Sequence, residues 1–366
     1  MRKKALITGV TGQDGAYLAK LLLEKGYEVY GGYRRNSTLN LWRLKELNIE
    51  KHVKLVPFDL LEFTNIFRII ELIQPDEVYN LAAQSFVATS FEQPIVTCEI
   101  NALGPLRILE ALRTLKPDAK FYQASTSEMF GQSNTIPQDE NTMFHPRSAY
   151  AFSKVMAHWA TINYREAFGM FTCCGILFNH ESPLRGLEFV TRKITYSVSR
   201  IKYGLQDKLI LGDLSTQRDW GFAPEYVEAM WLMMQQNEPD DYVIATGEAH
   251  SVKEFVEKAF KVINIDLIWH KYGNIERAYD KDNGRPLVET SEQFSRPADV
   301  PILIGNTSKA RQKLGWAPRV KFDHLVELMV EADLERVFNS INQKSFAVSF
   351  PFIPSDNRKY PKNNFM

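Results

Sequence analysis

The feature that most constrains the fold of this chain is a glycine-rich turn close to its N-terminus. A short apolar run at residues 4–8 leads into the segment GVTGQDG at residues 9–15, and an apolar-periodic stretch follows at 16–25. A buried strand that breaks into such a turn and continues as a helix lets backbone N–H groups approach a pyrophosphate, whose charge suits the helix N-terminus. The sequence therefore predicts a dinucleotide-binding unit, with candidate cofactor contacts at Gly9, Thr11, Gly12, Gln13, Asp14 and Gly15.

Strand and helix patterns alternate through the first half of the chain. We expect strands near residues 5, 28, 53, 77, 120 and 172, and helices over 16–25, 62–73, 103–115 and 149–168. This alternation predicts an α/β fold with a doubly wound parallel sheet, a Rossmann fold, followed by a smaller C-terminal α/β lobe that binds the substrate. The expected boundaries are 1–180 for the dinucleotide domain, 181–340 for the second lobe with some return to the first near 215–250, and 341–366 for a tail.

Polar residues follow the second and third predicted strands. After the second strand, an NAD-binding chain usually places an acidic residue for the ribose hydroxyls; this sequence has Arg34, Arg35, Asn36 and Ser37 instead. Guanidinium groups suit a 2′-phosphate, so the sequence favours NADP over NAD, the alternative being a solvated basic turn. Asp59 and Leu60 follow the third strand, where the carboxylate could meet the adenine edge.

Composition narrows the class of protein. Among 366 residues, Lys plus Arg equals Asp plus Glu at 44 each, so no basic field for nucleic acid is expected. No apolar run is long enough to span a membrane, and the N-terminus leads into a strand, so we expect a cytoplasmic protein. Neither the seven histidines nor the cysteines show metal-ligand spacing; Cys98, Cys173 and Cys174 are expected to be buried thiols, and no metal is expected.

Two residues four apart suggest the chemistry. Tyr150 and Lys154 would share one face of a helix, so the ammonium could favour the phenolate and make the phenol a usable base. An exposed helix pair is the simpler alternative. Thr126 and Glu128, at the end of a predicted strand, favour the catalytic interpretation, because chemical groups gather at the carboxyl ends of parallel strands.

Five segments in order carry a resemblance to a known family: residues 7–15, 80–87, 123–131, 177–183 and 217–221, which read ITGVTGQDG, NLAAQSFV, QASTSEMFG, LFNHESP and QRDWG. Over roughly residues 3–336, the chain resembles the extended short-chain dehydrogenase/reductase family. Within its nucleotide-sugar-modifying branch, it is similar to the GDP-mannose 4,6-dehydratases.

This resemblance implies an internal redox cycle that converts GDP-D-mannose to GDP-4-keto-6-deoxy-D-mannose with bound NADP. Tyr150 would take the C4 hydroxyl proton, Thr126 would hydrogen-bond the C4 oxygen, and Lys154 would hold the nicotinamide ribose. Glu128 would remove the C5 proton and help expel the C6 hydroxyl as water. Simple dehydrogenases and epimerases of this superfamily lack an acid at that position, so Glu128 favours elimination over a surface role.

The resemblance also implies binding residues and an assembly. Further cofactor contacts would come from Leu81, Ala83, Ser85, Tyr150, Lys154, His180 and Arg185. A GDP-sugar substrate would meet Ser85, Thr126, Glu128, Tyr150, Asn179, Val190, Lys193, Arg218, Arg296 and Asp299, with arginines at the pyrophosphate. A structural ion pair is the alternative for each charged member. The expected assembly is a homotetramer or homodimer, with no nucleic-acid or membrane partner.

Three departures from the family pattern leave alternatives open. Ala149 stands where these dehydratases usually have proline, Asp299 replaces a glutamate, and the charged loop 281–285 has no derived role. Three alternative hypotheses remain. The substrate could be a related GDP sugar such as a manno-configured heptose, the protein could be an NADP-dependent nucleotide-sugar epimerase or reductase, or it could be a non-catalytic dinucleotide sensor.

Overall fold

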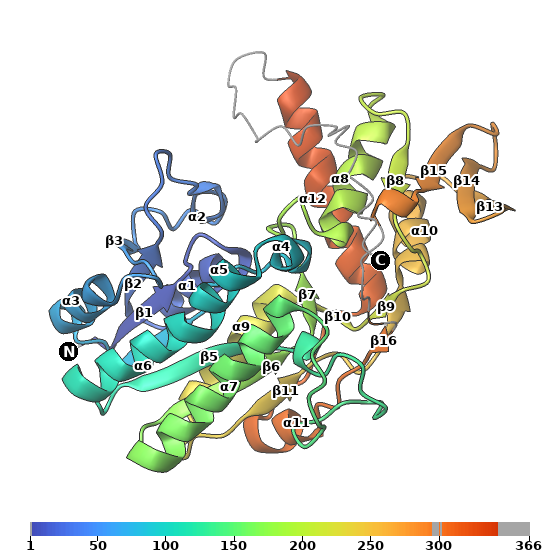
Figure 1. Ribbon diagram of the computed structural model, residues 1–366. Helices are drawn as coiled ribbons and strands as arrows, with labels where there is room; N and C mark the ends of the chain where they lie inside the picture. Colours follow the sequence, from blue (N-terminus) through green and yellow to red (C-terminus); the bar gives the residue numbers. More distant parts are fainter. Residues whose placement is uncertain (1, 295–299, 301, 343–366) are drawn as a thin grey trace.

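A computed structural model of the protein describes residues 2–294, 300 and 302–342. Its larger lobe is built on a seven-stranded sheet with the order β11-β6-β5-β4-β1-β2-β3 (Figure 1). All neighbouring strands in this sheet are parallel. The strands are β1 (Lys4–Thr8), β2 (Glu28–Tyr33), β3 (Lys54–Pro57), β4 (Glu77–Asn80), β5 (Lys120–Thr126), β6 (Thr172–Leu177) and β11 (Tyr242–Ile244).

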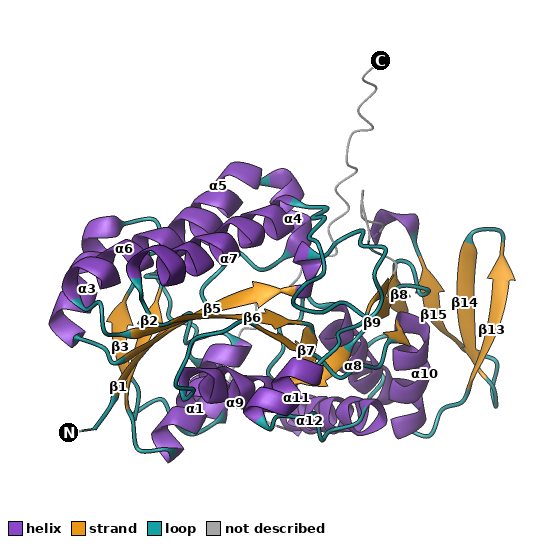
Figure 2. Ribbon diagram, turned by 90° about the horizontal axis from the view of Figure 1, so that it is seen from below, coloured by secondary structure: helices purple, strands orange, loops and turns teal. Residues whose placement is uncertain are grey.

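Helices cover both faces of this sheet (Figure 2). One face carries α3 (Phe63–Ile73), α4 (Val87–Glu92), α5 (Pro94–Cys98), α6 (Gly104–Leu115) and α7 (Ala149–Phe168), with the π-helical turn η1 (Glu99–Leu103). The other face carries α1 (Gln13–Glu24), α9 (Ala223–Met234) and α11 (Ser308–Leu314). Short elements connect the layers: α2 (Trp42–Glu46) and the 3-10 turn η2 (Ser127–Met129). Because the central strands are covered on both sides, β4 and β6 are buried along their whole length, whereas the edge strand β3 is partly exposed.

The second lobe has its own apolar core. Three helices pack together in it: α8 (Val190–Lys202), α10 (Val252–Val262) and α12 (Phe322–Asn342). A four-stranded sheet holds β8 (Leu209–Leu211), β13 (Leu267–Tyr272), β14 (Ile275–Asp280) and β15 (Pro286–Thr290). The remaining elements are β7 (Asn179–Glu181), β9 (Gln217–Arg218), β10 (Trp220–Phe222), β12 (His250–Ser251), β16 (Ile302–Leu303) and η3 (Glu292–Phe294).

The predicted fold class is confirmed, and several element boundaries need correction. Helix α1 begins at Gln13, three residues earlier than predicted, because Gly12 is extended and ends the turn. Strand β11 was not predicted as part of the parallel sheet, although it pairs with β6. Helix α12 extends to Asn342, so the first two residues of the predicted tail are helical; the rest of the tail lies outside the described residues.

Candidate active site

The glycine turn forms a narrow cradle between β1 and α1. Gly9 has φ +71°, and the N–H of Gly12 donates to the Gly9 carbonyl over 2.9 Å. A Cβ on Gly9 would lie 2.9 Å from Cα of Ala82, and one on Gly15 would lie 2.4 Å from the Gly9 oxygen. Among the described residues, no side chain caps the N-terminus of α1, so its first N–H groups point at the turn. The cradle therefore fits the diphosphate of a nicotinamide dinucleotide.

A buried ion pair supports the first turn of α1. His180 Nε2 donates to Asp14 Oδ2 over 2.8 Å, and His180 Nδ1 lies 2.8 Å from the Phe178 carbonyl oxygen. Since both ring nitrogens face oxygen acceptors, the ring donates twice and is an imidazolium. Burial opposes both charges, yet the carboxylate raises the pKa of His180, and the imidazolium lowers the pKa of Asp14. The pair therefore holds the first turn of α1, which follows the glycine turn, against β7.

A row of hydrogen bonds joins the carboxyl ends of β1 and β4 to the middle of β5. Thr8 Oγ1 donates to Asn80 Oδ1 over 2.7 Å, and Asn80 Nδ2 donates to Gln123 Oε1 over 2.8 Å. The N–H groups of Leu81 and Ala82 both donate to Thr8 Oγ1 over 3.1 Å. This row fixes where the segment containing Leu81, Ala83 and Ser85 leaves the sheet, next to the glycine turn.

Thr126, Glu128 and Tyr150 come together beyond the end of β5. Thr126 is the last residue of β5, and its Oγ1 accepts the N–H of Glu128, the middle residue of η2, over 3.3 Å. Tyr150 lies in the first turn of α7, whose N-cap Ser148 accepts the N–H of Ala151. Burial raises the pKa of Tyr150 to about 12, while a Thr126 hydrogen bond lowers it and the Glu128 charge raises it. The structure thus places an acid, a hydroxyl and a phenol at one point.

Lys154 is buried one turn after Tyr150. Its Nζ donates to the Ala124 carbonyl over 2.9 Å and lies 6.0 Å from the centre of the Tyr150 ring. Burial lowers the pKa of Lys154 to about 8. That Lys154 lowers the pKa of Tyr150 stays a prediction: the Ala124 carbonyl of β5 holds the ammonium, and burial sets the direction of the Tyr150 shift.

The predicted 2′-phosphate residues Arg34, Arg35, Asn36 and Ser37 are exposed in the segment after β2. Asp59 follows β3 and accepts the N–H of Leu61 over 3.0 Å, while Leu60 is buried. Arg43, which sequence reasoning missed, donates through Nε to the Leu184 carbonyl and through Nη1 to the Thr11 carbonyl. It therefore fixes the glycine turn against the chain that leads to Arg185. No local signal marks this arginine, since both contacts come from tertiary structure.

The predicted substrate residues of the second lobe are spread over three elements. Asn179 begins β7, and Val190 begins α8, where the amine of the half-buried Lys193 lies 3.8 Å from the centre of the Phe294 ring. Burial lowers the pKa of Lys193 to about 8. Arg218, in β9, is buried and donates to the Val300 carbonyl over 2.7 Å. Arg185 pairs with Glu181 over 3.0 Å and stacks on Phe189. Arg296 and Asp299 lie outside the described residues.

The family description "GDP-mannose 4,6 dehydratase" matches residues 6–329 of the chain. The chain belongs to this family. GDP-mannose 4,6 dehydratase 2 of Arabidopsis thaliana is 53% identical over 344 residues, covering 91% of this chain and 87% of the relative. The human GDP-mannose 4,6 dehydratase is 50% identical, covering 91% and 92%.

A solved structure extends the comparison to the fold. The chain matches RMD from Pseudomonas aeruginosa, solved in complex with NADPH, with a TM-score of 0.71 and 21% identity, covering 91% of this chain and 100% of that one. This likeness confirms the Rossmann-type architecture. Over the described part of the chain, no helix is long and apolar enough to cross a membrane. Within the same residues, His, Cys, Asp and Glu form no group of three or more that could hold a metal ion.

Proposed function

We propose that this protein is a hydro-lyase that converts GDP-D-mannose to GDP-4-keto-6-deoxy-D-mannose, with NADP as the bound cofactor. The observation that carries the proposal is Glu128 on η2, next to Thr126 and close enough to Tyr150 for its charge to act on the phenol. Membership of the GDP-mannose 4,6-dehydratase family supports the substrate class.

The side chains divide the proton transfers between them. Tyr150 must be the phenolate to take the C4 hydroxyl proton, so the pKa that burial raises to about 12 must fall when cofactor and substrate bind. Thr126 holds the C4 oxygen by hydrogen bond. Once C4 is a ketone, the C5 proton is acidic; Glu128 removes it and passes it to the C6 hydroxyl, which leaves as water. The proton held by Tyr150 returns to C5, which closes the balance. The nicotinamide, when bound, supplies the hydride chemistry: hydride leaves C4 and returns to C6.

NADP is favoured over NAD by charge. Arg34 and Arg35 are exposed directly after β2, where a 2′-phosphate would lie, and the described segment 34–41 contains no acidic residue for the ribose hydroxyls. A cytoplasmic location is also part of the proposal. It is supported by the three cysteines, which are all free thiols, as expected in a reducing compartment.

A homo-oligomer is part of the proposal. Phe152, Met156 and Trp159 lie one turn apart on α7 and are exposed, with Trp159 57% accessible. Ile95 of α5, 77% accessible, and Phe91 of α4 extend this apolar face on the same side of the sheet (Figure 2). A contiguous apolar face of this kind marks a protein–protein contact, and a second copy is the partner the prediction names.

The test of the elimination role is the Glu128→Gln variant. Loss of the carboxylate should leave C4 oxidation possible and stop water loss, so the variant should accumulate reduced nicotinamide when mixed with GDP-mannose. We expect turnover to fall by roughly 10²- to 10⁴-fold, the usual contribution of a general base. Glu140, a half-buried glutamate that bonds the Val243 N–H, offers a matched Glu140→Gln control. Full water loss by the Glu128 variant would contradict the proposal.

A further inference from the structure

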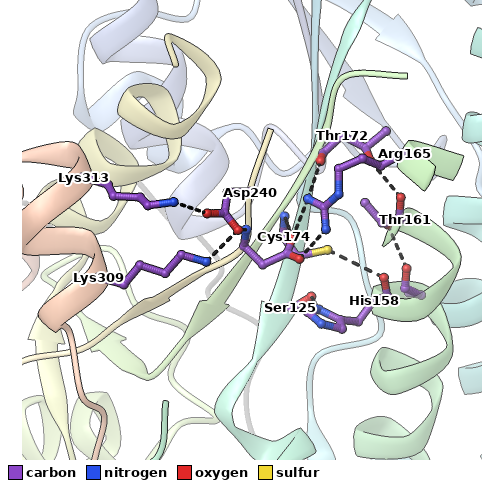
Figure 3. Close-up of polar contacts among 11 residues, drawn as sticks. Ser125, His158, Thr161, Arg165, Thr172, Cys174, Asp240, Lys309 and Lys313 are labelled. Carbon is purple, nitrogen blue, oxygen red and sulfur yellow. Dashed lines mark hydrogen bonds and ion pairs between the residues drawn. The ribbon is translucent and has the colours of Figure 1, made fainter. Parts of the chain in front are cut away.

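Helix α7 is anchored to the sheet by polar contacts on its successive turns. Lys154 donates to the Ala124 carbonyl, and His158 Nδ1 lies 3.0 Å from Ser125 Oγ; both partners belong to β5. Farther along, Thr172 Oγ1 of β6 donates to the Thr161 carbonyl over 2.7 Å. Figure 3 shows His158, Thr161 and Arg165 following one another along this side of the helix. The two anchors nearest Tyr150 therefore hold the strand that ends at Thr126.

The Ser125–His158 contact is fully enclosed. Ser125 is 3% and His158 is 4% exposed, and the Phe144 ring packs edge-on against the imidazole with centres 5.2 Å apart. Burial lowers the pKa of His158 to about 4, so the ring is neutral at neutral pH and the contact is an uncharged hydrogen bond. A buried bond of this kind holds one geometry, because losing either partner leaves an unpaired polar atom in the core.

The positions of the two partners give the contact a specific consequence. Ser125 directly precedes Thr126, and His158 lies two helical turns after Tyr150. We propose that Ser125 and His158 are a positioning pair that sets the separation of the Thr126 hydroxyl and the Tyr150 phenol. The pair touches neither substrate nor cofactor and acts through these two groups. Its catalytic consequence rests on the proposed function, whereas its geometric consequence does not.

The competing explanation is that the pair only stabilises the core. The Thr172–Thr161 contact is the control that distinguishes the two explanations. It joins the same helix to the sheet through an equally buried hydroxyl, but this hydroxyl belongs to β6. Thr172→Val removes that bond with little change in shape, and Thr172 pairs with Phe121 near the start of β5, four residues before Ser125. His158→Leu removes the proposed positioning bond, and His158→Asn restores a polar atom near the place of Nδ1.

The experiment compares wild type, His158→Leu, His158→Asn, Ser125→Ala and Thr172→Val, all as the NADP-loaded protein. We expect His158→Leu and Ser125→Ala to lower kcat for GDP-mannose by roughly 10- to 100-fold with little change in KM, since a displaced group costs transition-state stabilisation. Thr172→Val should lose comparable stability in denaturant unfolding and keep kcat within about twofold. His158→Asn should recover most of the lost turnover.

Crystal structures of wild type and His158→Leu provide an arm that needs no substrate. The separation between Thr126 Oγ1 and Tyr150 Oη should change in His158→Leu and stay unchanged in Thr172→Val. An unchanged separation, or a kcat loss no larger than that of Thr172→Val, would overturn the positioning role. If wild type leaves GDP-mannose intact, the proposed function fails, and the crystallographic comparison still decides the positioning role.

Discussion

Asp14 and His180 make the site sensitive to pH at the scale of single residues. The folded protein raises the pKa of His180, so its contribution to stability is complete below the ordinary histidine value, about 6.5, and is lost as the pH rises through the folded value. It lowers the pKa of Asp14, so that contribution is lost only as the pH falls below the ordinary aspartate range. The pair therefore stabilises most between these limits.

We predict that His180→Gln lowers the free energy of unfolding most near pH 5 to 6, by roughly 1.5 to 3 kcal/mol. The difference from wild type should shrink as the pH rises beyond the ordinary histidine range. Urea unfolding over a pH series measures it, with the exposed His324→Gln as the matched control. A difference that grows with pH would contradict the ion pair.

The sequence predicted that these residues belong to the site but not which partners they contact. Asp14 and His180 were both predicted as cofactor contacts, but their pairing was not, since 166 positions separate them. The role of Lys154 toward Tyr150 was predicted from helical spacing, which puts two side chains on one face without saying where the ammonium points. It points at the Ala124 carbonyl. Spacing predicts shared faces, and tertiary structure decides partners.

At the scale of elements, capping residues explain which boundaries could be predicted. Helix α7 spans Ala149–Phe168 as expected, because Ser148 caps its start and Gly169, with φ +67°, ends it. Strand β11 has three residues, too few for a periodic signal, and it joins the sheet only through tertiary pairing with β6. The strand ends that carry the site were predictable, because parallel strands present their carboxyl ends together.

Alanine substitutions at two glycines of the β1–α1 turn should lower cofactor retention to different extents. Gly15→Ala would put a Cβ 2.4 Å from the Gly9 oxygen and 2.6 Å from Val10 Cα, so the backbone must shift. Gly12→Ala would place its Cβ 3.2 Å from the same oxygen, a milder contact. We expect the NADP content of the purified protein to fall strongly for Gly15→Ala and less for Gly12→Ala. If both variants retain as much NADP as the wild-type protein, the turn does not cradle the cofactor.

Substitutions on the exposed face of α7 test whether this face is the contact between subunits. Replacing Met156 and Trp159 together by glutamate should lower the molar mass measured by light scattering, because two charges would be buried in an apolar contact. Phe338→Glu, at a similarly exposed phenylalanine of α12, is the control and should leave the mass unchanged. If the double variant keeps the wild-type mass, the subunits meet elsewhere.

At the scale of the whole molecule, the site depends on two lobes that sequence-distant segments hold together. The first turn of α1 bonds through Gln13 to the His180 carbonyl and to Ser182, while β9 carries Arg218 from the second lobe. The fold class and family could be predicted because motif blocks occur in order along the chain. The substrate contacts could be proposed only by resemblance, since each is a single charged or polar residue.

The most direct test of the central claim is to incubate the purified, NADP-loaded protein with GDP-mannose and no added reductant, and to follow the nucleotide sugar by mass spectrometry. A 4,6-dehydratase should give a product lighter by one water with no net change in reduced nicotinamide, since the hydride that leaves C4 returns to C6. A product of unchanged mass, or one formed only with consumption of added NADPH, would contradict this function and indicate epimerisation or reduction instead.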